Sequence, residues 1–321
     1  MGRRTMVDSD REMRRRFSRR HEEWCDTDYD REAFEADLSD ATLVDGHFHV
    51  RPNPDGARGY DERIAAVEET IGWMDEHGVD RIVTQPLESP EGSTDYVPTW
   101  WSLEVAERYP ERIVAFCCVD PRFNTWEGYD WFADRIDEFV DRGARGFGEL
   151  KIGMDIDDTR LQMLYDICAD RDLPILFHLD ESHVVDQIGL PGLERMVQKF
   201  SGLDFIMHAH GWWAHVSGDV TPGETATYPD GDVEPGGRVD YFLSEYDNVY
   251  GDISAGSGFN ALTRDREFGQ AFLDRHHEKL IWGSDVAGPS DVPQFAFFER
   301  FDLEPDQWEN IRFRNLEGIL R

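Results

Sequence analysis

Residues 42–50 read Thr42-Leu-Val-Asp-Gly-His-Phe-His-Val50, and the predicted fold depends on this stretch. Its apolar residues predict a buried strand, the first of the main domain. An open doubly wound sheet would follow such a strand with a phosphate loop of the form G-x-G-x-x-G or G-x-x-x-x-G-K-[ST]. The chain offers Asp45-Gly-His-Phe-His49 instead. The sequence therefore favours a closed parallel barrel over an open sheet.

A regular alternation of strand and helix patterns follows this first strand. The eight predicted strands span residues 42–50, 79–85, 112–119, 144–151, 174–179, 203–208, 248–253 and 280–283. The predicted helices span residues 62–77, 100–109, 127–142, 158–171, 191–200, 239–246 and 266–277. A long loop rich in Gly, Pro, Asp and Thr covers residues 211–238. Eight β/α units predict a (β/α)₈ TIM barrel of the α/β class.

The chain divides by composition into two parts. Residues 1–40 are highly charged and are predicted to form an N-terminal extension, with one helix over residues 10–24, that packs outside the main domain. We expect residues 41–321 to form a single barrel domain, closed by one or two helices over residues 305–320. A length of 321 residues suits one large barrel.

The charge balance is strongly acidic. There are 33 Lys plus Arg against 67 Asp plus Glu, a formal net charge of −34, and the carboxylates are spread along the whole chain. Nucleic acid and anionic membrane surfaces are therefore poor partners. Only three of the cations are lysines: Lys151, Lys199 and Lys279. A dispersed acidic surface that avoids lysine predicts a halophilic protein, because concentrated salt screens the repulsion between carboxylates.

The sequence also carries expectations about location. It has no apolar run of about 18 residues, which a membrane-spanning helix needs, and its charged N-terminus does not resemble a signal peptide. We therefore expect a cytoplasmic protein. The four cysteines lack the C-x-x-C spacing of a structural zinc site and are expected to be reduced core residues.

Polar residues follow the apolar runs of several predicted strands. His47 and His49 are two apart on one strand, so their imidazoles face the same way. An H-x-H pair alone is weak evidence, because histidine is often a hydrogen-bonded core or surface residue. However, His178, His208 and Asp285 end or follow the fifth, sixth and eighth strands. Catalytic groups of (β/α)₈ barrels gather at this end, so the set predicts a metal site.

These residues and their flanking segments resemble the amidohydrolase superfamily, in particular the branch that includes aminocarboxymuconate-semialdehyde decarboxylase. The resemblance covers roughly residues 42–321 and includes Gly146-Phe-Gly-Glu-Leu-Lys151, Pro174-Ile-Leu-Phe-His-Leu-Asp180, Gly251-Asp-Ile-Ser-Ala-Gly-Ser257 and Trp282-Gly-Ser-Asp285. It implies that one divalent ion, with Zn²⁺ the expected metal, is held by His47, His49, His178 and Asp285. It also implies a catalytic His208, for which His210 is the competitor, and a supporting role for Glu149. The alternative for Glu149 is a salt bridge with an arginine. A homodimer is a further implication of the resemblance.

The expected activity follows from these parts. A divalent ion lowers the pKa of bound water, Asp285 can accept the proton, and His208 can stabilise negative charge on the substrate. The leading hypothesis is a hydrolase of a small amide, ester or lactone. The alternatives are a non-oxidative decarboxylase that uses the same metal site and a non-catalytic binding protein that kept the barrel. Trp212 and Trp213 are predicted either to form a substrate-binding wall or to pin the 211–238 loop to the barrel.

Overall fold

A closed ring of parallel strands forms the centre of the molecule. The computed structural model describes residues 6–26, 30–52, 59–124 and 126–320. The strands are β1 (Val44–Phe48), β2 (Arg81–Thr84), β3 (Ile113–Ala115), β4 (Phe147–Leu150), β5 (Ile175–His178), β6 (Phe205–His208), β7 (Val249–Asp252) and β8 (Leu280–Ile281). β1–β3 and β4–β8 pair in chain order, and every pairing is parallel. Parallel bridges between Cys117 and Phe147 and between Phe48 and Val286 close the ring. The predicted (β/α)₈ barrel is confirmed.

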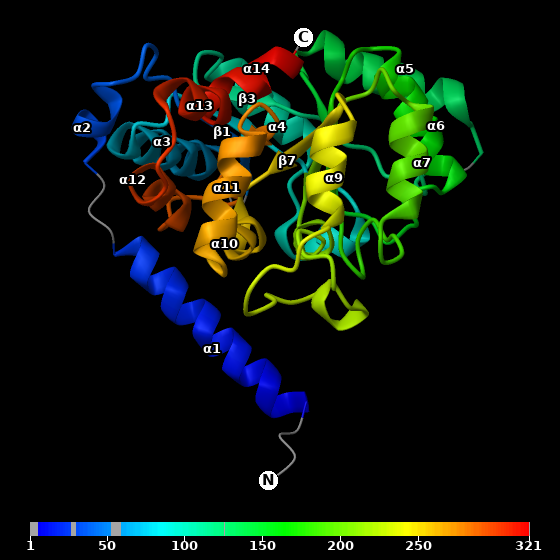
Figure 1. The fold of residues 1–321 in the computed structure, drawn as a ribbon. Coiled ribbons are helices and arrows are strands. Elements are labelled where there is room, and N and C mark those ends of the chain that lie inside the picture. Colours follow the sequence, from blue (N-terminus) through cyan, green and yellow to red (C-terminus); the bar gives the residue numbers. More distant parts are fainter. Residues whose placement is uncertain (1–5, 27–29, 53–58, 125, 321) are drawn as a thin grey trace.

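Helices connect successive strands and surround the ring (Figure 1). The predicted helices correspond to α3 (Tyr60–His77), α4 (Thr99–Arg108), α5 (Tyr129–Asp141), α6 (Thr159–Ala169), α7 (Pro191–Lys199), α9 (Arg238–Glu245) and α11 (Arg266–His276). α3 ends where predicted, because Gly78 adopts the left-handed conformation, with φ 68°. The tail contains α13 (Pro305–Glu309), a π-helical segment η5 (Asn310–Arg314) and α14 (Asn315–Ile319), close to the predicted 305–320.

Several short helices lie in segments that were not expected to be helical. They are α8 (His210–Ala214), α10 (Ala255–Thr263), α12 (Phe297–Arg300) and the 3₁₀ helices η2 (Pro90–Asp95), η3 (Pro222–Glu224) and η4 (Pro293–Ala296). α8 and α10 begin at a strand end, next to Ala209 (φ 81°) and Ala255 (φ 56°). A positive φ is rare for alanine, so the local sequence gives little sign of these sharp turns.

The N-terminal residues contribute two helices, α1 (Met6–Cys25) and α2 (Arg31–Glu35). α1 extends from the body on the same side as the 211–238 loop (Figure 1). Its Trp24 is buried and its ring lies 5.5–5.6 Å from the rings of Phe259, Phe297 and Phe301. The division of the chain into an extension and one barrel domain stays a prediction. No helix among the described residues is long and apolar enough to cross a membrane.

The C-terminal helix closes one end of the barrel. A compact apolar cluster joins strand residues to the tail and consists of Val44, Val83, Phe116, Leu176, Ile206, Ile281, Phe313, Leu316 and Ile319. Arg81, the first residue of β2, forms an ion pair with Glu317 of α14. The closed end is therefore the N-terminal end of the strands, and their C-terminal ends face the opposite side.

We predict that Gly46→Ala destabilises the protein by about 1–3 kcal/mol. A Cβ at residue 46 would lie 2.6 Å from Ile281 Cγ2 and 3.2 Å from Leu316 Cδ2. Gly318→Ala is the matched control, because a Cβ there meets nothing within 4 Å and alanine favours the helix. Urea unfolding followed by circular dichroism would measure both. Equal midpoints for the two variants would contradict the packing around β1.

Candidate metal centre

The C-terminal ends of the strands bring a set of histidines and carboxylates together, all buried except the half-buried Asp285. The set consists of His47 and His49 of β1, Glu149 of β4, His178 of β5, His208 of β6, Asp252 of β7 and Asp285 after β8. Residues up to 238 positions apart in the chain thus meet at one end of the barrel, as the strand-end pattern predicted.

Hydrogen bonds fix the orientation of the two β1 imidazoles. His47 Nδ1 lies 2.6 Å from Asp252 Oδ2, and His49 Nδ1 lies 2.8 Å from the carbonyl oxygen of Gln85. Both partners are acceptors, so each Nδ1 donates a proton and each Nε2 is directed into the site. The two Nε2 atoms are only 3.2 Å apart. Two lone pairs at this distance repel unless a proton or a cation lies between them.

Two carboxylates face the same point. Asp285 Oδ1 lies 3.3 Å from His47 Nε2 and 3.1 Å from His49 Nε2. Glu149 Oε2 lies 3.8 Å and 3.4 Å from the same two atoms. This oxygen is buried and accepts no hydrogen bond from the part of the chain that the structure describes. A buried carboxylate oxygen without a hydrogen bond is costly unless a cation compensates it.

The spacing of these donor atoms fits a metal ion. Ligand atoms about 2.0–2.2 Å from a tetrahedral ion are about 3.3–3.6 Å from one another. Most of the separations among His47 Nε2, His49 Nε2, Asp285 Oδ1 and Glu149 Oε2 lie near that range, between 3.1 and 3.8 Å. The second atoms of both histidines are held by acceptors, as is usual for metal-binding histidine. The residues therefore fit a divalent cation.

His178 reaches this group through Glu149. Its Nδ1 lies 2.5 Å from Glu149 Oε1, and its Nε2 lies 3.3 Å from Asp180 Oδ2. Donor atoms of Glu149, His178 and His208 form a second group with metal-binding spacing. The structure thus brings all four sequence-predicted ligands to one end of the barrel, with Glu149 between His178 and the β1 histidines. Glu149 turns inward and pairs with histidine, where the sequence alternative was an arginine.

His208 lies beside both His47 and His178, with ring centroids 4.6 Å and 5.4 Å away. Its Nδ1 is 3.1 Å from Asp252 Oδ2 and 3.2 Å from Ser254 Oγ, while its Nε2 is 3.5 Å from Asp285 Oδ2. Burial opposes protonation, but the charge of Asp252 outweighs it and raises the pKa of His208 to about 9. His208 therefore holds a proton that can point into the site.

The electrostatics of the site favour positive charge at its centre. Burial disfavours a charged His47, yet Asp285 and Asp252 raise its pKa well above the usual range. Conversely, the pKa of Asp285 is well below its usual range, because interactions with His47, His208 and His49 outweigh burial. The site is built to hold positive charge, either as protons or as a metal ion.

Some supporting residues were not identified from the sequence. Asp45 is fully buried and accepts hydrogen bonds from Ser284 N (2.9 Å), Ser284 Oγ (2.5 Å) and His47 N (3.1 Å), which fixes β1 to the turn before Asp285. Asp252 orients both His47 and His208. The rule that found His178, a polar residue at a strand end, also applies to Asp252.

The remaining predicted site residues take different positions. Trp212 and Trp213 of α8 are 0% and 2% exposed. They pack in the core, and Trp213 Nε1 donates to the carbonyl oxygen of Asp252 (2.9 Å). Of the two expected roles, this placement favours the loop-pinning one, and the substrate-wall role stays a prediction. His210, at the start of α8, is half-buried, and its ring lies 4.7 Å from that of Tyr228.

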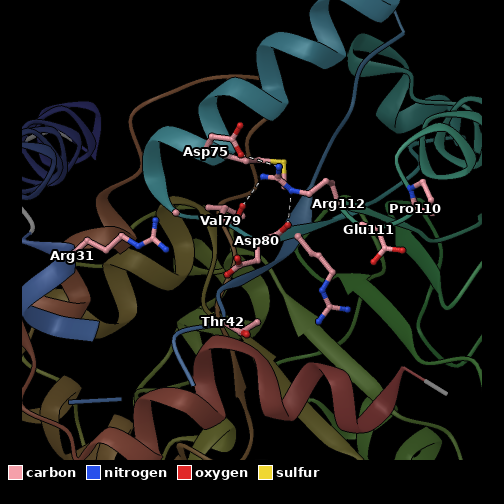
Figure 2. A pocket seen from close by; sticks show the side chains of 11 residues that line it. Arg31, Thr42, Asp75, Val79, Asp80, Pro110, Glu111 and Arg112 are labelled. Atoms are coloured by element: carbon pink, nitrogen blue, oxygen red, sulfur yellow. Dashed lines mark hydrogen bonds and ion pairs between the residues drawn. The ribbon is translucent and has the colours of Figure 1, made fainter. Parts of the chain in front are cut away.

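Two cavities lie at opposite ends of the barrel. One of about 570 Å³ is lined by Thr42, Asp80 and Arg112, which precede β1–β3, so it lies away from the histidines (Figure 2). Its Arg112 pairs with Asp75 (2.8 Å). The other, of about 460 Å³, has a lining that includes Val50 and Val286, one residue beyond His49 and Asp285. This second cavity lies between helix α3 and the segments that follow β1 and β8, and none of the histidines lines it.

Comparisons with known proteins give one curated relative by sequence and several solved structures that share this fold. A curated relative, the bifunctional NAD(P)H-hydrate repair enzyme of Methanocaldococcus jannaschii, is 26% identical over 150 residues, which span 46% of this chain but only 26% of that protein. An uncharacterised TIM-barrel protein from Bordetella bronchiseptica is 18% identical, with a TM-score of 0.60 over 87% of this chain and 98% of its own. A 5-carboxyvanillate decarboxylase from Novosphingobium aromaticivorans, complexed with manganese, is 14% identical, with a TM-score of 0.53 over 87% and 96%.

The family model for amidohydrolases matches residues 44–315. The match includes all eight strands and the histidines and carboxylates at their C-terminal ends. The family resemblance predicted from the sequence is confirmed: the chain belongs to the amidohydrolase family.

Proposed function

We propose that the protein is a metal-dependent hydrolase of a small amide, ester or lactone. The observation that carries the proposal is the convergence of His47 Nε2, His49 Nε2 and Asp285 Oδ1 within 3.1–3.3 Å of one another. We propose these three residues and His178 as ligands, with Glu149 as an additional ligand or the support of His178. Zn²⁺ is the expected ion, although nitrogen and oxygen ligands also accept Mn²⁺.

A divalent ion held there would supply Lewis-acid chemistry, polarising the substrate carbonyl and lowering the pKa of water. The protein residues would supply the rest. Asp285 Oδ2 lies 3.5 Å from His208 Nε2, so both side chains border the same space. A water molecule in that space could give its proton to the Asp285 carboxylate. His208, held by Asp252, can donate a hydrogen bond to negative charge that develops on a substrate oxygen.

A carbon–carbon lyase is the second candidate. The position of His208 favours it, because loss of CO₂ leaves an electron pair on carbon that must take a proton, and His208 Nε2 faces the site 3.5 Å from Asp285 Oδ2. The structural similarity to a manganese-containing decarboxylase also supports it. The same residues would then bind the substrate carboxylate instead of activating water.

We also propose that the acidic surface is an adaptation to concentrated salt, in view of the net charge of −34. The cytoplasmic location and the homodimer expected from the sequence stay predictions.

We predict that the purified protein contains a divalent metal and that chelation removes both activity and stability. Elemental analysis and thermal unfolding before and after dialysis against EDTA would measure this.

Asp285→Ala and His178→Ala should each abolish activity while the circular dichroism spectrum stays unchanged. His277→Ala is the control, because His277 bonds Asn310 and follows α11. A metal-free wild type whose melting temperature does not rise with Zn²⁺ or Mn²⁺ would instead indicate a non-catalytic barrel.

The two reaction classes can be separated by their products. We predict that the metal-loaded protein, incubated with lactones, amides and esters in H₂¹⁸O, places ¹⁸O in a new carboxylate, because hydrolysis adds water across the cleaved bond. Mass spectrometry would detect the label. Release of CO₂ from aromatic or enoic acids, without ¹⁸O incorporation into the remaining product, would identify a decarboxylase instead.

We predict that the melting temperature rises between about 0.1 M and about 2 M KCl, because the Debye length falls from about 10 Å to below about 3 Å and repulsion between surface carboxylates is screened. Differential scanning fluorimetry over a KCl series would measure the change. A melting temperature that stays constant or falls over the series would contradict the halophilic interpretation.

A further inference from the structure

An aromatic pair joins the N-terminal helix α1 to the long loop after β6. The ring of Phe17 stacks on the ring of Tyr228, with 3.9 Å between centroids and 7° between planes. Phe17 lies outside residues 44–315, the part matched to the family. A segment beyond the common barrel therefore contacts the loop on the side where the strands end.

Both residues that follow Tyr228 are also tied to α1. Arg16 Nη1 lies 2.6 Å from Asp230 Oδ2. Arg20 donates to the side-chain oxygen of Asn260, whose Nδ2 donates in turn to the carbonyl oxygen of Pro229 (2.9 Å). Three consecutive loop residues thus depend on one helix for their position, two of them directly and Pro229 through Asn260.

α1 itself is anchored elsewhere. The buried Trp24, two turns along the helix from Phe17, packs among the rings of Phe259, Phe297 and Phe301. Removing the Phe17 ring would therefore take away the stacking contact on Tyr228 without detaching the helix, while the Arg16–Asp230 ion pair remains.

Tyr228 stands at the edge of the candidate metal centre. Its ring lies 4.7 Å from that of His210, two residues after His208. A Cβ added to Gly256 would lie 2.7 Å from Tyr228 Oη, and Gly256 is two residues beyond Ser254, which contacts His208. Burial raises the pKa of the Tyr228 phenol, and the negative charge of Asp285 raises it further, in keeping with a position near that carboxylate.

We propose that Tyr228, positioned by Phe17 of α1, forms an outer wall of the catalytic mouth and limits which small anions and substrates reach the metal. A simple packing role for the pair would leave access to the site unchanged. The inference rests on the proposed function, because the wall controls access only if the strand-end histidines bind a metal.

The test uses dipicolinate, a small planar dicarboxylate chelator, on the full-length metal-loaded protein. We expect Phe17→Ala and Tyr228→Ala to keep the wild-type metal content but to lose the metal to dipicolinate at least fivefold faster. Hydrogen exchange of residues 224–232 should also become faster in Phe17→Ala. Arg19→Ala is the control, because Arg19 is exposed on the same helix and, within the described part of the chain, its side chain bonds only the carbonyl oxygen of Arg15.

The outcomes separate the two proposals. A wild-type protein that binds no metal would overturn the proposed function and, with it, the wall. Normal metal content with wild-type rates of metal loss in both aromatic variants would overturn the wall alone. If Phe17→Ala does not fold, the rate of metal loss from Tyr228→Ala alone tests the proposal. We expect this variant to fold, because Tyr228 belongs to a surface loop in which Gly223 and Asp230 are exposed.

Discussion

The position of one buried carboxylate, Asp252, determines where the Nε2 atoms of two histidines in the site point. Its Oδ2 lies within 3.1 Å of Nδ1 of both His47 and His208 and accepts a hydrogen bond from Ser254 Oγ at 2.9 Å. Because each histidine gives its Nδ1 proton to this one oxygen, both Nε2 atoms turn toward the centre of the site. Without Asp252 either ring could rotate or change tautomer, and the convergence with Asp285 would be lost.

Closure of the barrel between β8 and β1 positions Asp285, the carboxylate that faces the two β1 histidines. Asp285 does not follow β8 in an extended conformation, because its φ is 58° and its backbone N–H donates to the carbonyl oxygen of His47 (2.7 Å). The bonds from Ser284 to Asp45 hold this turn against β1. The last strand is therefore connected to the first through the residues that flank the predicted ligands. The fold and the site share the same hydrogen bonds, so a change that opens the ring also separates the ligands.

Much of this arrangement could be predicted from the sequence, and the rest could not for physical reasons. Strands buried on both faces appear as apolar runs, and barrels gather polar residues where such runs end, which located His178 and His208. The helix α10 was not predicted because Gly256 and Gly258 favour a turn and tertiary contacts outweigh that preference. The inward direction of Glu149 and the burial of Trp212 depend on contacts between distant segments, which local patterns do not contain.

The negative charge of the site explains why its carboxylates lie next to histidines. Glu149 and Asp252 are each 1% exposed, and the half-buried Asp285 shares their histidine partners, so three carboxylates meet where little water reaches two of them. Buried charges of one sign are costly unless opposite charge compensates them. Protons on the histidines can supply part of that compensation, as the raised pKa values of His47 and His208 indicate. A divalent cation at the point where His47, His49 and Asp285 converge would supply it without using the imidazole lone pairs for protons. The same three carboxylates that raise the pKa values of His47 and His208 would then also favour metal binding.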